Sequence, residues 1–360
     1  MSDANAVLTV DLDAITANWL ALDARTPGAE CAGVVKADGY GLGAVPVART
    51  LHDVGCRRFF VATLPEAIAL RAALPDAWIA AMGAPVQGLA ALFHEHRITA
   101  VLSSDGAVEA WTADGGGQPV WLQLDTGMTR LGLDADAAEA ALKAGKLQVE
   151  ALMSHLGCAD EPANPMNEQQ RTRFARLREL APGCPGSLAA SSGIFLGPGF
   201  HHDVVRPGAA LYGINPTPGQ ANPMRPTVRL AARILQLRRA ADGARVGYGA
   251  TGAPPPGALL ATVGLGYADG FLRRMGSGGA MSLDGHRLPL VGRVSMDLIV
   301  VDASSAPPHL LREGAWVEAI GPAADVDGLA DACGTIGYEI LTSLGARLER
   351  RYARGAGRNA

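Results

Sequence analysis

Cysteine is scarce in this 360-residue chain and follows no recognisable pattern. The five cysteines are scattered, and no two form a C-x-x-C pair: Cys31, Cys56, Cys158, Cys184 and Cys333. An odd, sparse set argues against a disulfide framework and favours reduced thiols, as in cytosolic proteins. The His-Glu-His run at 94–96 and the histidine pair at 201–202 lack a third ligand at zinc spacing, so we predict no metal site.

Long apolar runs are also missing. No stretch of about 18 apolar residues is present to span a membrane, and residues 1–15 lack the basic and apolar segments of a signal peptide. Charged residues make up 18% of the chain and the net charge is −4, which argues against a nucleic-acid partner. Hydrophobic residues reach 48%, enough for an extensive core. We therefore predict a soluble, cytoplasmic, globular protein that binds neither membranes nor nucleic acids.

Short apolar runs alternate with helical patterns over the first two-thirds of the chain. Eight runs read as buried strands: 32–36, 58–62, 78–82, 98–102, 120–124, 149–154, 188–190 and 204–206. Helical patterns lie between most of them, including 64–73, 88–96, 134–144 and 167–180. This alternation is typical of a parallel sheet covered on both faces. Eight strands suit a (β/α)8 barrel, although a doubly wound open sheet is an alternative that strand counting does not exclude.

The unusual polar residues favour the barrel, because each falls at or just after the end of a predicted strand. They are Lys36, Arg130, His155, Ser191 with Ser192, and Arg206 with Gly208. In a barrel the carboxyl ends of all the strands share one face, where active sites are built.

The composition of the chain changes at residues 214–223, which form a connector rich in proline and asparagine. Strand-like runs follow at 228–237, 258–263, 287–291, 296–301 and 316–320, and a hairpin turn is predicted at Asp284-Gly285. Two helices are expected near the end, around 328–333 and 338–344. We predict a barrel domain at residues 11–225 and a mostly β domain at 226–360, with the N-terminal strand in residues 1–10 pairing with the second domain.

One stretch stands out chemically. In residues 32–43 an apolar run reaches Lys36 and then passes into glycines around Tyr40. A buried ammonium is unfavourable unless it is paired, or neutral and used. Such a lysine is the usual nucleophile for a Schiff base with an aldehyde cofactor or a carbonyl substrate. The alternative is a lysine whose stem leaves a strand end and reaches water.

The stretch VVKADGYGLGA resembles the cofactor-lysine motif of alanine racemases, in which lysine binds pyridoxal 5′-phosphate (PLP). Further segments resemble other motifs of that family in the same order: 124–132 (LDTGMTRLG), 154–161, 205–213 (VRPGAALYG), 266–270, 292–297 and 335–339. The resemblance covers almost the whole chain. It implies an N-terminal (β/α)8 TIM barrel followed by a C-terminal mostly-β domain, and a racemase that interconverts L-alanine and D-alanine.

The same resemblance implies roles for individual residues. Lys36 and Tyr267 are the two bases, on opposite faces of the PLP-bound substrate. Arg130 and the backbone amide of Met296 bind the substrate carboxylate. The implied PLP-binding set is Lys36, Tyr40, Arg130, His155, Ser191, Ser192, Arg206, Gly208, Ala209 and Tyr338. His155 and Arg206 are expected to be the cationic link that lowers the high pKa of the tyrosine. A homodimer with shared active sites is also implied.

Two positions depart from the commoner pattern of the family. Gln123 stands where many members carry a carbamylated lysine, and its amide can accept a hydrogen bond from Arg130 but carries no charge. We therefore predict that no carbamate is present and that activity does not depend on carbon dioxide. Ser191-Ser192 replaces the usual asparagine-serine pair, which shortens one side chain below the cofactor.

Other readings stay open at this point. A broader-specificity or serine racemase, or a fold-type III PLP decarboxylase, would share much of the chemistry. A non-catalytic PLP carrier lacks a β domain. An aldolase that forms a Schiff base without a cofactor would have no use for the phosphate-binding tyrosines or Arg206.

Overall fold

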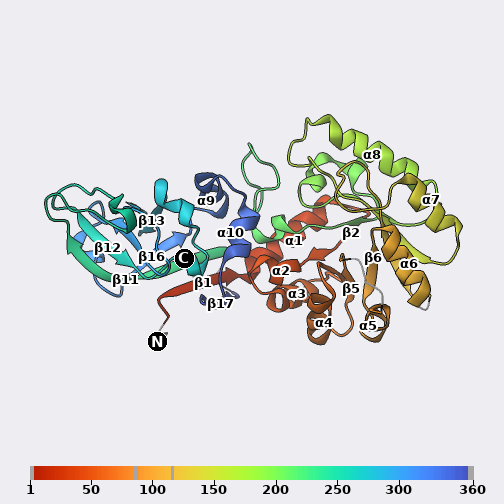
Figure 1. Cartoon of the computed structure of the whole chain (residues 1–360), viewed down its shortest axis with the longest axis horizontal. Coiled ribbons are helices and arrows are strands. Elements are labelled where there is room, and N and C mark those ends of the chain that lie inside the picture. The colour runs from red at the N-terminus through yellow and green to blue at the C-terminus, as the bar shows by residue number, and fades with distance from the viewer. Residues whose placement is uncertain (1–3, 84–87, 115–116, 356–360) are drawn as a thin grey trace. The chain divides into compact units, whose positions relative to one another are not determined.

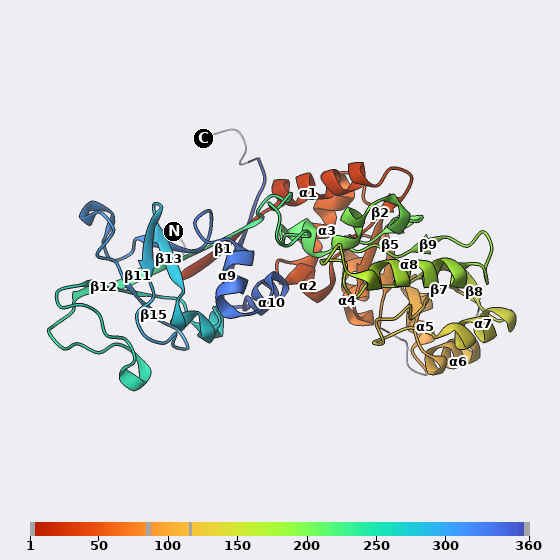
Figure 2. The ribbon, with the colours of Figure 1, turned by 90° about the horizontal axis from the view of Figure 1, so that it is seen from above.

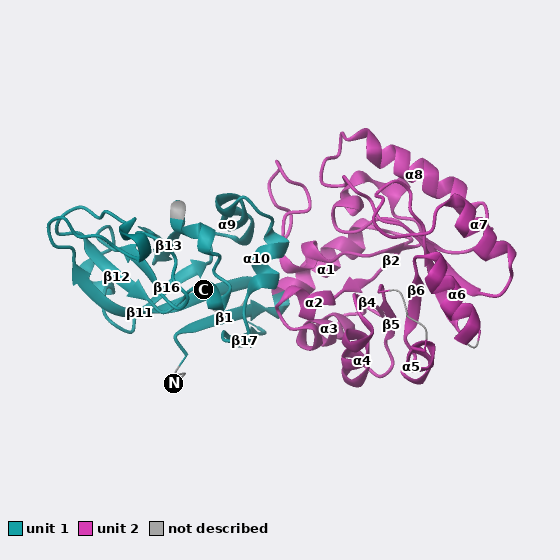
Figure 3. Ribbon diagram, viewed as in Figure 1, with its two compact units in different colours: residues 1–13, 226–360 teal, residues 14–225 magenta. Residues whose placement is uncertain are grey.

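The computed structural model describes residues 4–83, 88–114 and 117–355. The chain forms two compact units, residues 14–225 and residues 1–13 with 226–360 (Figure 3). We describe each unit by itself. In the described part of the chain no helix is both long and apolar enough to cross a bilayer.

Residues 14–225 form a closed barrel of parallel strands. The strands of the main sheet lie in the order β3 (Gly33–Val34), β4 (Arg58–Val61), β5 (Trp78–Ala81), β6 (Thr99–Leu102), β7 (Pro119–Gln123), β8 (Gln148–Met153) and β9 (Gly186–Ser187). β2 (Glu30–Cys31) continues into β3 across Ala32, and it pairs in parallel with β10 (Val204–Val205). The predicted (β/α)8 barrel is confirmed.

Backbone hydrogen bonds on both sides of β10 close the ring. The Ala32 and Val34 amides donate to Val205 O and Pro207 O, and the Arg206 amide donates to Ala189 O. The seven strands of the main sheet together with β10 thus give the eight barrel strands of a TIM barrel. The predicted strands 188–190 and 204–206 shift, since β9 ends at Ser187 and β10 at Val205. The residues beyond them turn away to form the face of the barrel that carries the unusual side chains.

Helices cover the outside of this barrel (Figures 1 and 2). They are α1 (Leu12–Arg25), α3 (Ala44–Asp53), α4 (Leu64–Ala73), α5 (Ala90–Glu95), α6 (Asp105–Asp114), α7 (Ala135–Lys143) and α8 (Pro165–Arg178). α4 has the predicted bounds. Local caps explain several starts, since Thr63 and Glu66 form a capping box and Asp134 and Asn164 cap α7 and α8. One short helical segment, α2 (Lys36–Tyr40), lies between β3 and α3.

The amino-terminal ends of the barrel strands carry a paired charge cluster, which we call the barrel floor: Glu30, Arg58, Trp78 and Glu150. Arg58 Nε lies 2.7 Å from Glu30 Oε2, and its Nη1 lies 3.0 Å from Glu150 Oε1. The guanidinium carbon lies 4.7 Å from the centre of the Trp78 ring. One cation on β4 thus links its own strand to β2, β5 and β8 at this end.

The other unit is built on a mostly antiparallel sheet. Its central path is β14 (His286–Pro289), β13 (Ala280–Leu283), β16 (Trp316–Ile320), β11 (Val228–Arg239), β1 (Ala6–Asp11) and β17 (Glu349–Ala353), while β12 (Leu259–Val263) joins β11 to β15 (Ile299–Asp302). The N-terminal strand β1 pairs with β11 and with β17. The helices α9 (Val326–Cys333) and α10 (Gly337–Ser343) lie close to the predicted positions.

The predicted turn at Asp284-Gly285 is confirmed: it joins β13 to β14, with φ of 49° and 78°. The predicted strand at 296–301 is shorter, because the ladder with β12 begins at Ile299. Before that point the backbone bonds to a different segment. Ser295 O and Met296 O accept from the amides of Tyr267 and Ala268.

Candidate active site

The sequence predicted that Lys36 is the last residue of a strand. In the structure the strand ends before it, and Lys36 begins a left-handed turn. β3 ends at Val34, and Ala37, Asp38 and Tyr40 then have φ of 53°, 51° and 56°. The Gly39 amide closes the first turn on Val35 O at 2.9 Å. For residues other than glycine this backbone is about 1–2 kcal/mol less favourable than the right-handed form. The surroundings must therefore hold the turn in place.

Contacts from three directions hold it. The Ala37 amide donates to Glu66 Oε1 at 2.8 Å, and the Ala44 amide donates to Asp38 Oδ1 at 2.8 Å. The hydroxyl of Tyr212, a buried residue, donates to Val34 O at 3.1 Å. The turn places Lys36 at the carboxyl-terminal face of the barrel, which we call the barrel mouth.

Four basic side chains converge at the barrel mouth: Lys36, Arg130, His155 and Arg206. Burial, and then the charges of Arg130 and Arg206, lower the pKa of Lys36, while Glu66 acts in the opposite direction. Burial lowers the pKa of Arg206 to about 10. Arg206 donates to Ser187 Oγ and, at 2.6 Å, to Ser154 O. The arginine is thus fixed by neutral acceptors, and its charge stays available to a ligand.

His155 is not the cation that the sequence analysis expected. Burial, and then the charges of Arg206, Arg130 and Lys36, lower its pKa to about 3. The imidazole is therefore neutral at neutral pH, because burial and then the neighbouring positive charges disfavour its protonated form. Arg206 remains as the charged member of the expected pair.

A close approach between Tyr40 and Gly208 forms a cradle beside this cluster. A Cβ on Gly208 would lie 2.3 Å from Tyr40 Oη, so only glycine fits here. Tyr40 is buried, and its ring stacks on Tyr212 with centroids 4.7 Å apart. Ala209 follows at the start of a 3₁₀ turn (Ala209–Tyr212), where the first amide has no partner within the turn itself.

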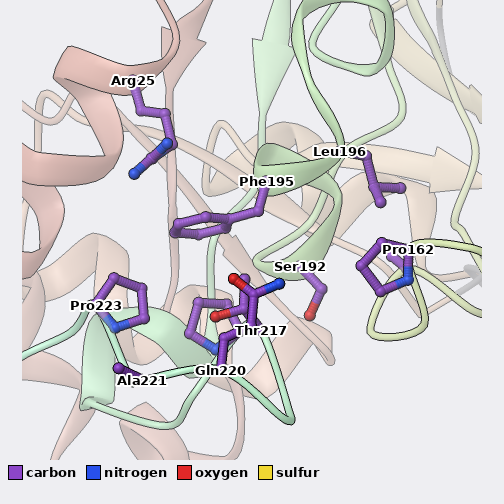
Figure 4. A pocket seen from close by; sticks show the side chains of 11 residues that line it. Arg25, Pro162, Ser192, Phe195, Leu196, Thr217, Gln220, Ala221 and Pro223 are labelled. Carbon is purple, nitrogen blue, oxygen red and sulfur yellow. The ribbon is translucent and has the colours of Figure 1, made fainter.

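Ser191 holds the cradle rather than pointing into it. Its buried Oγ accepts from the Gly208 amide at 3.0 Å and from the Ala210 amide at 3.1 Å. Ser192 lines a cavity of about 340 Å³ between the end of α1, the turn that follows Ser191 and the connector (Figure 4). Arg25, Phe195 and Thr217 line the same cavity. Among the described residues that line it, Ser192 is the one member of the predicted cofactor set.

The loop that carries Arg130 is tied at both ends. Asp125 Oδ1 accepts from the amides of Gly127 and Thr129, at 2.8 and 3.1 Å. The buried Gln123 donates through Nε2 to Leu131 O at 3.0 Å. The Gln123 amide can accept a hydrogen bond from Arg130, and through its Nε2 it also fixes the backbone beside that arginine. Arg130 itself is exposed.

Gln170, on α8, is a site residue that sequence reasoning missed. Its Nε2 lies 2.9 Å from His155 O and 3.1 Å from Thr126 Oγ1, and its Oε1 accepts from the Gly157 amide at 2.8 Å. Thr126 Oγ1 in turn lies 2.8 Å from Ser154 Oγ. Gln170 is fully buried. One sequence signal could have identified it: a polar residue four positions before Phe174 lies on the same, buried face of α8.

Tyr267, Met296 and Tyr338 belong to the other unit. Tyr267 and Met296 are neighbours there, because the Ala268 amide donates to Met296 O at 3.0 Å and a Cβ on Gly266 would lie 2.1 Å from that oxygen. Both side chains are exposed, at 41% and 52%. Tyr338 is 39% exposed in the first turn of α10.

Comparison with known proteins is consistent along the chain. Residues 10–216 match the family model of the alanine racemase N-terminal domain, and residues 227–352 match that of the C-terminal domain. An alanine racemase of Mesorhizobium japonicum, described as catabolic, is 50% identical over 98% of this chain and 94% of its own length. An alanine racemase of Rhodospirillum rubrum is 48% identical over 97% of this chain and 96% of its own length.

The fold agrees with a solved structure as well. The alanine racemase of Bartonella henselae, with covalently bound pyridoxal phosphate, superposes on this chain with a TM-score of 0.92 at 37% identity. The match covers 97% of this chain and 100% of that one.

Proposed function

This chain belongs to the alanine racemase family, and we propose that it interconverts L-alanine and D-alanine with PLP bound at Lys36. The observation that carries the proposal is the group of Lys36, Arg130 and Arg206 around a neutral His155 at the barrel mouth. A half-buried lysine with a lowered pKa is suited to act as a nucleophile and as a base.

The residues at the barrel mouth fit a phosphorylated, anionic cofactor. Clustered cations favour such an anion, and the close approach of Tyr40 Oη to Gly208 brings a hydroxyl to the start of the 3₁₀ turn (Ala209–Tyr212), where a phosphate can bind. In our proposal Tyr40, Ser192, Gly208, Ala209 and Tyr338 hold the phosphate. Ser191 acts by positioning Gly208 and Ala210. Arg206 would face the ring nitrogen, and Arg130 would face the phenolic oxygen and the substrate carboxylate.

PLP supplies the delocalisation that makes the α-proton of an amino acid removable. The protein supplies two proton-transfer groups. With its amine released from the cofactor by the incoming substrate amine, Lys36 Nζ would remove the α-proton from one face of the substrate, and Tyr267 Oη would return a proton to the other; the reverse direction would exchange the two roles. The lowered pKa of Lys36 increases the neutral amine available for the first step. The Met296 amide is the second donor to the substrate carboxylate.

Arg206 directs the outcome through its charge. With a pKa of about 10 it stays protonated at neutral pH, and a guanidinium has donors only. Facing the ring nitrogen of bound PLP, it would hold that atom as an acceptor without a proton. The ring would then withdraw electrons less strongly, which would favour return of the proton to the α-carbon over transamination or decarboxylation.

We further propose a homodimer in which each site takes Lys36 from one subunit and Tyr267 and Met296 from the other. The exposure of the adjacent Tyr267 and Met296 side chains supports this arrangement. A two-fold dimer makes both sites equivalent.

We also retain the domain bounds of 11–225 and 226–360, and a cytoplasmic location, which the five free cysteines support.

Absorbance and chiral analysis of the purified full chain test this function. We expect the protein to turn yellow with PLP and to convert L-alanine into a mixture of L- and D-alanine. A yellow protein that racemises L-serine but leaves alanine unchanged would point to the serine racemase alternative. A protein that takes up no PLP would overturn the cofactor assignment. The relatives' names do not favour the serine racemase or the decarboxylase.

A further inference from the structure

Glu66 contacts a segment outside the helix that it caps. In the first turn of α4 its Oε2 accepts from the Ala62 amide at 2.7 Å and from the Thr63 amide at 3.2 Å. The Thr63 hydroxyl accepts from the Glu66 amide in return, which completes a capping box. Its other oxygen, Oε1, lies 2.8 Å from the amide of Ala37, a residue 29 positions earlier in the chain.

Ala37 is the point where this extra contact matters most. It directly follows Lys36 and is the first residue of the left-handed turn, with φ of 53°. Alanine disfavours this conformation, so a strong external acceptor on its amide stabilises the turn. Because a carboxylate is a stronger acceptor than a neutral group, Glu66 suits this position. The side chain of Lys36 therefore leaves a backbone that Glu66 anchors.

The same carboxylate also affects the charge of the lysine. Four titratable groups face Lys36: Arg130 after β7, His155 after β8, Arg206 after β10, and Glu66 in α4. The two arginines disfavour its protonated form, and His155 is neutral. Glu66 is the acidic group that acts against them.

We propose that Glu66 is a positioning residue for Lys36, anchoring the turn that carries the amine and supplying negative charge beside it. The proposal rests on the proposed function of Lys36. The two residues that cap α4 thus have different roles. Thr63 only caps the helix, whereas Glu66 caps the helix and also positions Lys36. Neither role places Glu66 in contact with substrate or cofactor.

Competitive acetylation of the full-length protein, freed of cofactor, tests the charge. The chain has three lysines, and the exposed Lys143 and Lys146 serve as internal standards for Lys36. Mass spectrometry follows the labelling of each lysine against pH. In Glu66→Gln we expect the labelling midpoint of Lys36 to move to lower pH, while both standards stay unchanged. Thr63→Ala is the matched control, because it breaks the capping box but keeps the carboxylate, and its midpoint should equal that of wild type.

An unchanged or higher midpoint in Glu66→Gln overturns the role of the charge, and so does an equal shift in Thr63→Ala. A loosened turn would hydrate Lys36 and raise its pKa, so the direction of the shift separates charge from a purely structural loss. This measurement needs no racemase activity. A wild-type protein that fails to act on alanine would therefore count against the proposed function and leave this test intact.

Turnover with PLP tests the anchoring. A misplaced catalytic group can reduce turnover about 100-fold, and we expect a loss of this order in Glu66→Ala with a smaller change in KM. Adding Ala37→Gly should recover at least about ten-fold of that loss, since glycine adopts the left-handed backbone without penalty. If Ala37→Gly recovers nothing, anchoring of the turn is excluded as the role of Glu66.

Discussion

The two ends of the barrel treat positive charge in opposite ways. At the barrel floor Arg58 contacts two carboxylates and the face of Trp78. At the barrel mouth Lys36, Arg130 and Arg206 lie around a neutral His155, and Glu66 is the acid that acts on the lysine. Burial disfavours the charge of Arg58, but hydrogen bonds to Glu150 and Glu30 raise its pKa. Burial lowers the pKa of Arg206 to about 10, with no acid to reverse the effect.

This contrast separates stability from function. A cation that already has its anions holds strands together, as expected at the amino-terminal face of a barrel. Cations held by neutral groups, as Arg206 is by Ser187 and Ser154, make the free protein less stable but attract an anionic ligand. The same side-chain type is structural at the floor and functional at the mouth. The following predictions test that division.

The largest effect is expected at the two proposed bases. Lys36→Ala and Tyr267→Phe should each lower turnover at least about 1000-fold, because each removes a proton-transfer group. Lys143→Ala, an exposed lysine on α7, is the matched control and should keep wild-type turnover. A chiral assay of D-alanine formation measures all three variants.

Mixing the two inactive variants tests the shared site. Random exchange of subunits gives half hybrid dimers, each with one intact site, so about one quarter of wild-type activity should return. Lack of recovery after demonstrated subunit exchange would refute a site shared between subunits.

Leucine substitutions at the two ends should have opposite effects. Arg206→Leu at the mouth should lower turnover about 100-fold, yet change the free energy of unfolding by less than about 1 kcal/mol. The two hydrogen bonds that it loses are offset by removal of a buried charge that has no acid partner. Arg58→Leu at the floor should lower the free energy of unfolding by about 1–2 kcal/mol and leave the turnover of folded protein unchanged.

Urea unfolding and alanine turnover, measured on both variants, give the comparison. If Arg206→Leu is the less stable of the two, or Arg58→Leu the less active, the division between floor and mouth is wrong.

A smaller effect is expected from His155 as the pH changes. Its folded pKa of about 3 lies below the ordinary value of 6.5, so between these values the unfolded chain binds more protons than the folded one. Stability therefore rises with pH across that window, by at most about 1.4 kcal/mol per pH unit for one such group. His155→Gln should therefore lose less unfolding free energy than wild type when the pH falls from 7 to 5. His202→Gln is the matched control outside the mouth, since burial lowers its pKa to about 4. It should flatten the same loss without affecting turnover.

Much of the barrel could be predicted because its signals are local. Apolar strands and capped helices depend on residues that are neighbours in the sequence, as at Thr63 and Asp134. The positions of Lys36 and Arg206 follow from where the strands end. β17 was missed because it is charged and gains its order from β1. The left-handed turn was missed because one of the contacts that hold it comes from Glu66, 29 residues away in the sequence. Gln170 escaped for the same reason, since its partners lie on two other loops.

The smallest effect is expected at Gln123, where the prediction is no response at all. The side chain holds Leu131 O through a neutral amide, so the backbone next to Arg130 is fixed by a hydrogen bond rather than by an added charge. Removal of carbon dioxide and bicarbonate from the buffer should therefore leave turnover unchanged. A carbamate needs a neutral lysine amine, and glutamine offers none. Gln123→Lys should make turnover respond to bicarbonate, if the mouth accepts a negative charge at this position. A wild-type enzyme that loses activity without carbon dioxide would show that a lysine elsewhere supplies the charge, and that the mouth is not as poor in acids as its contacts indicate.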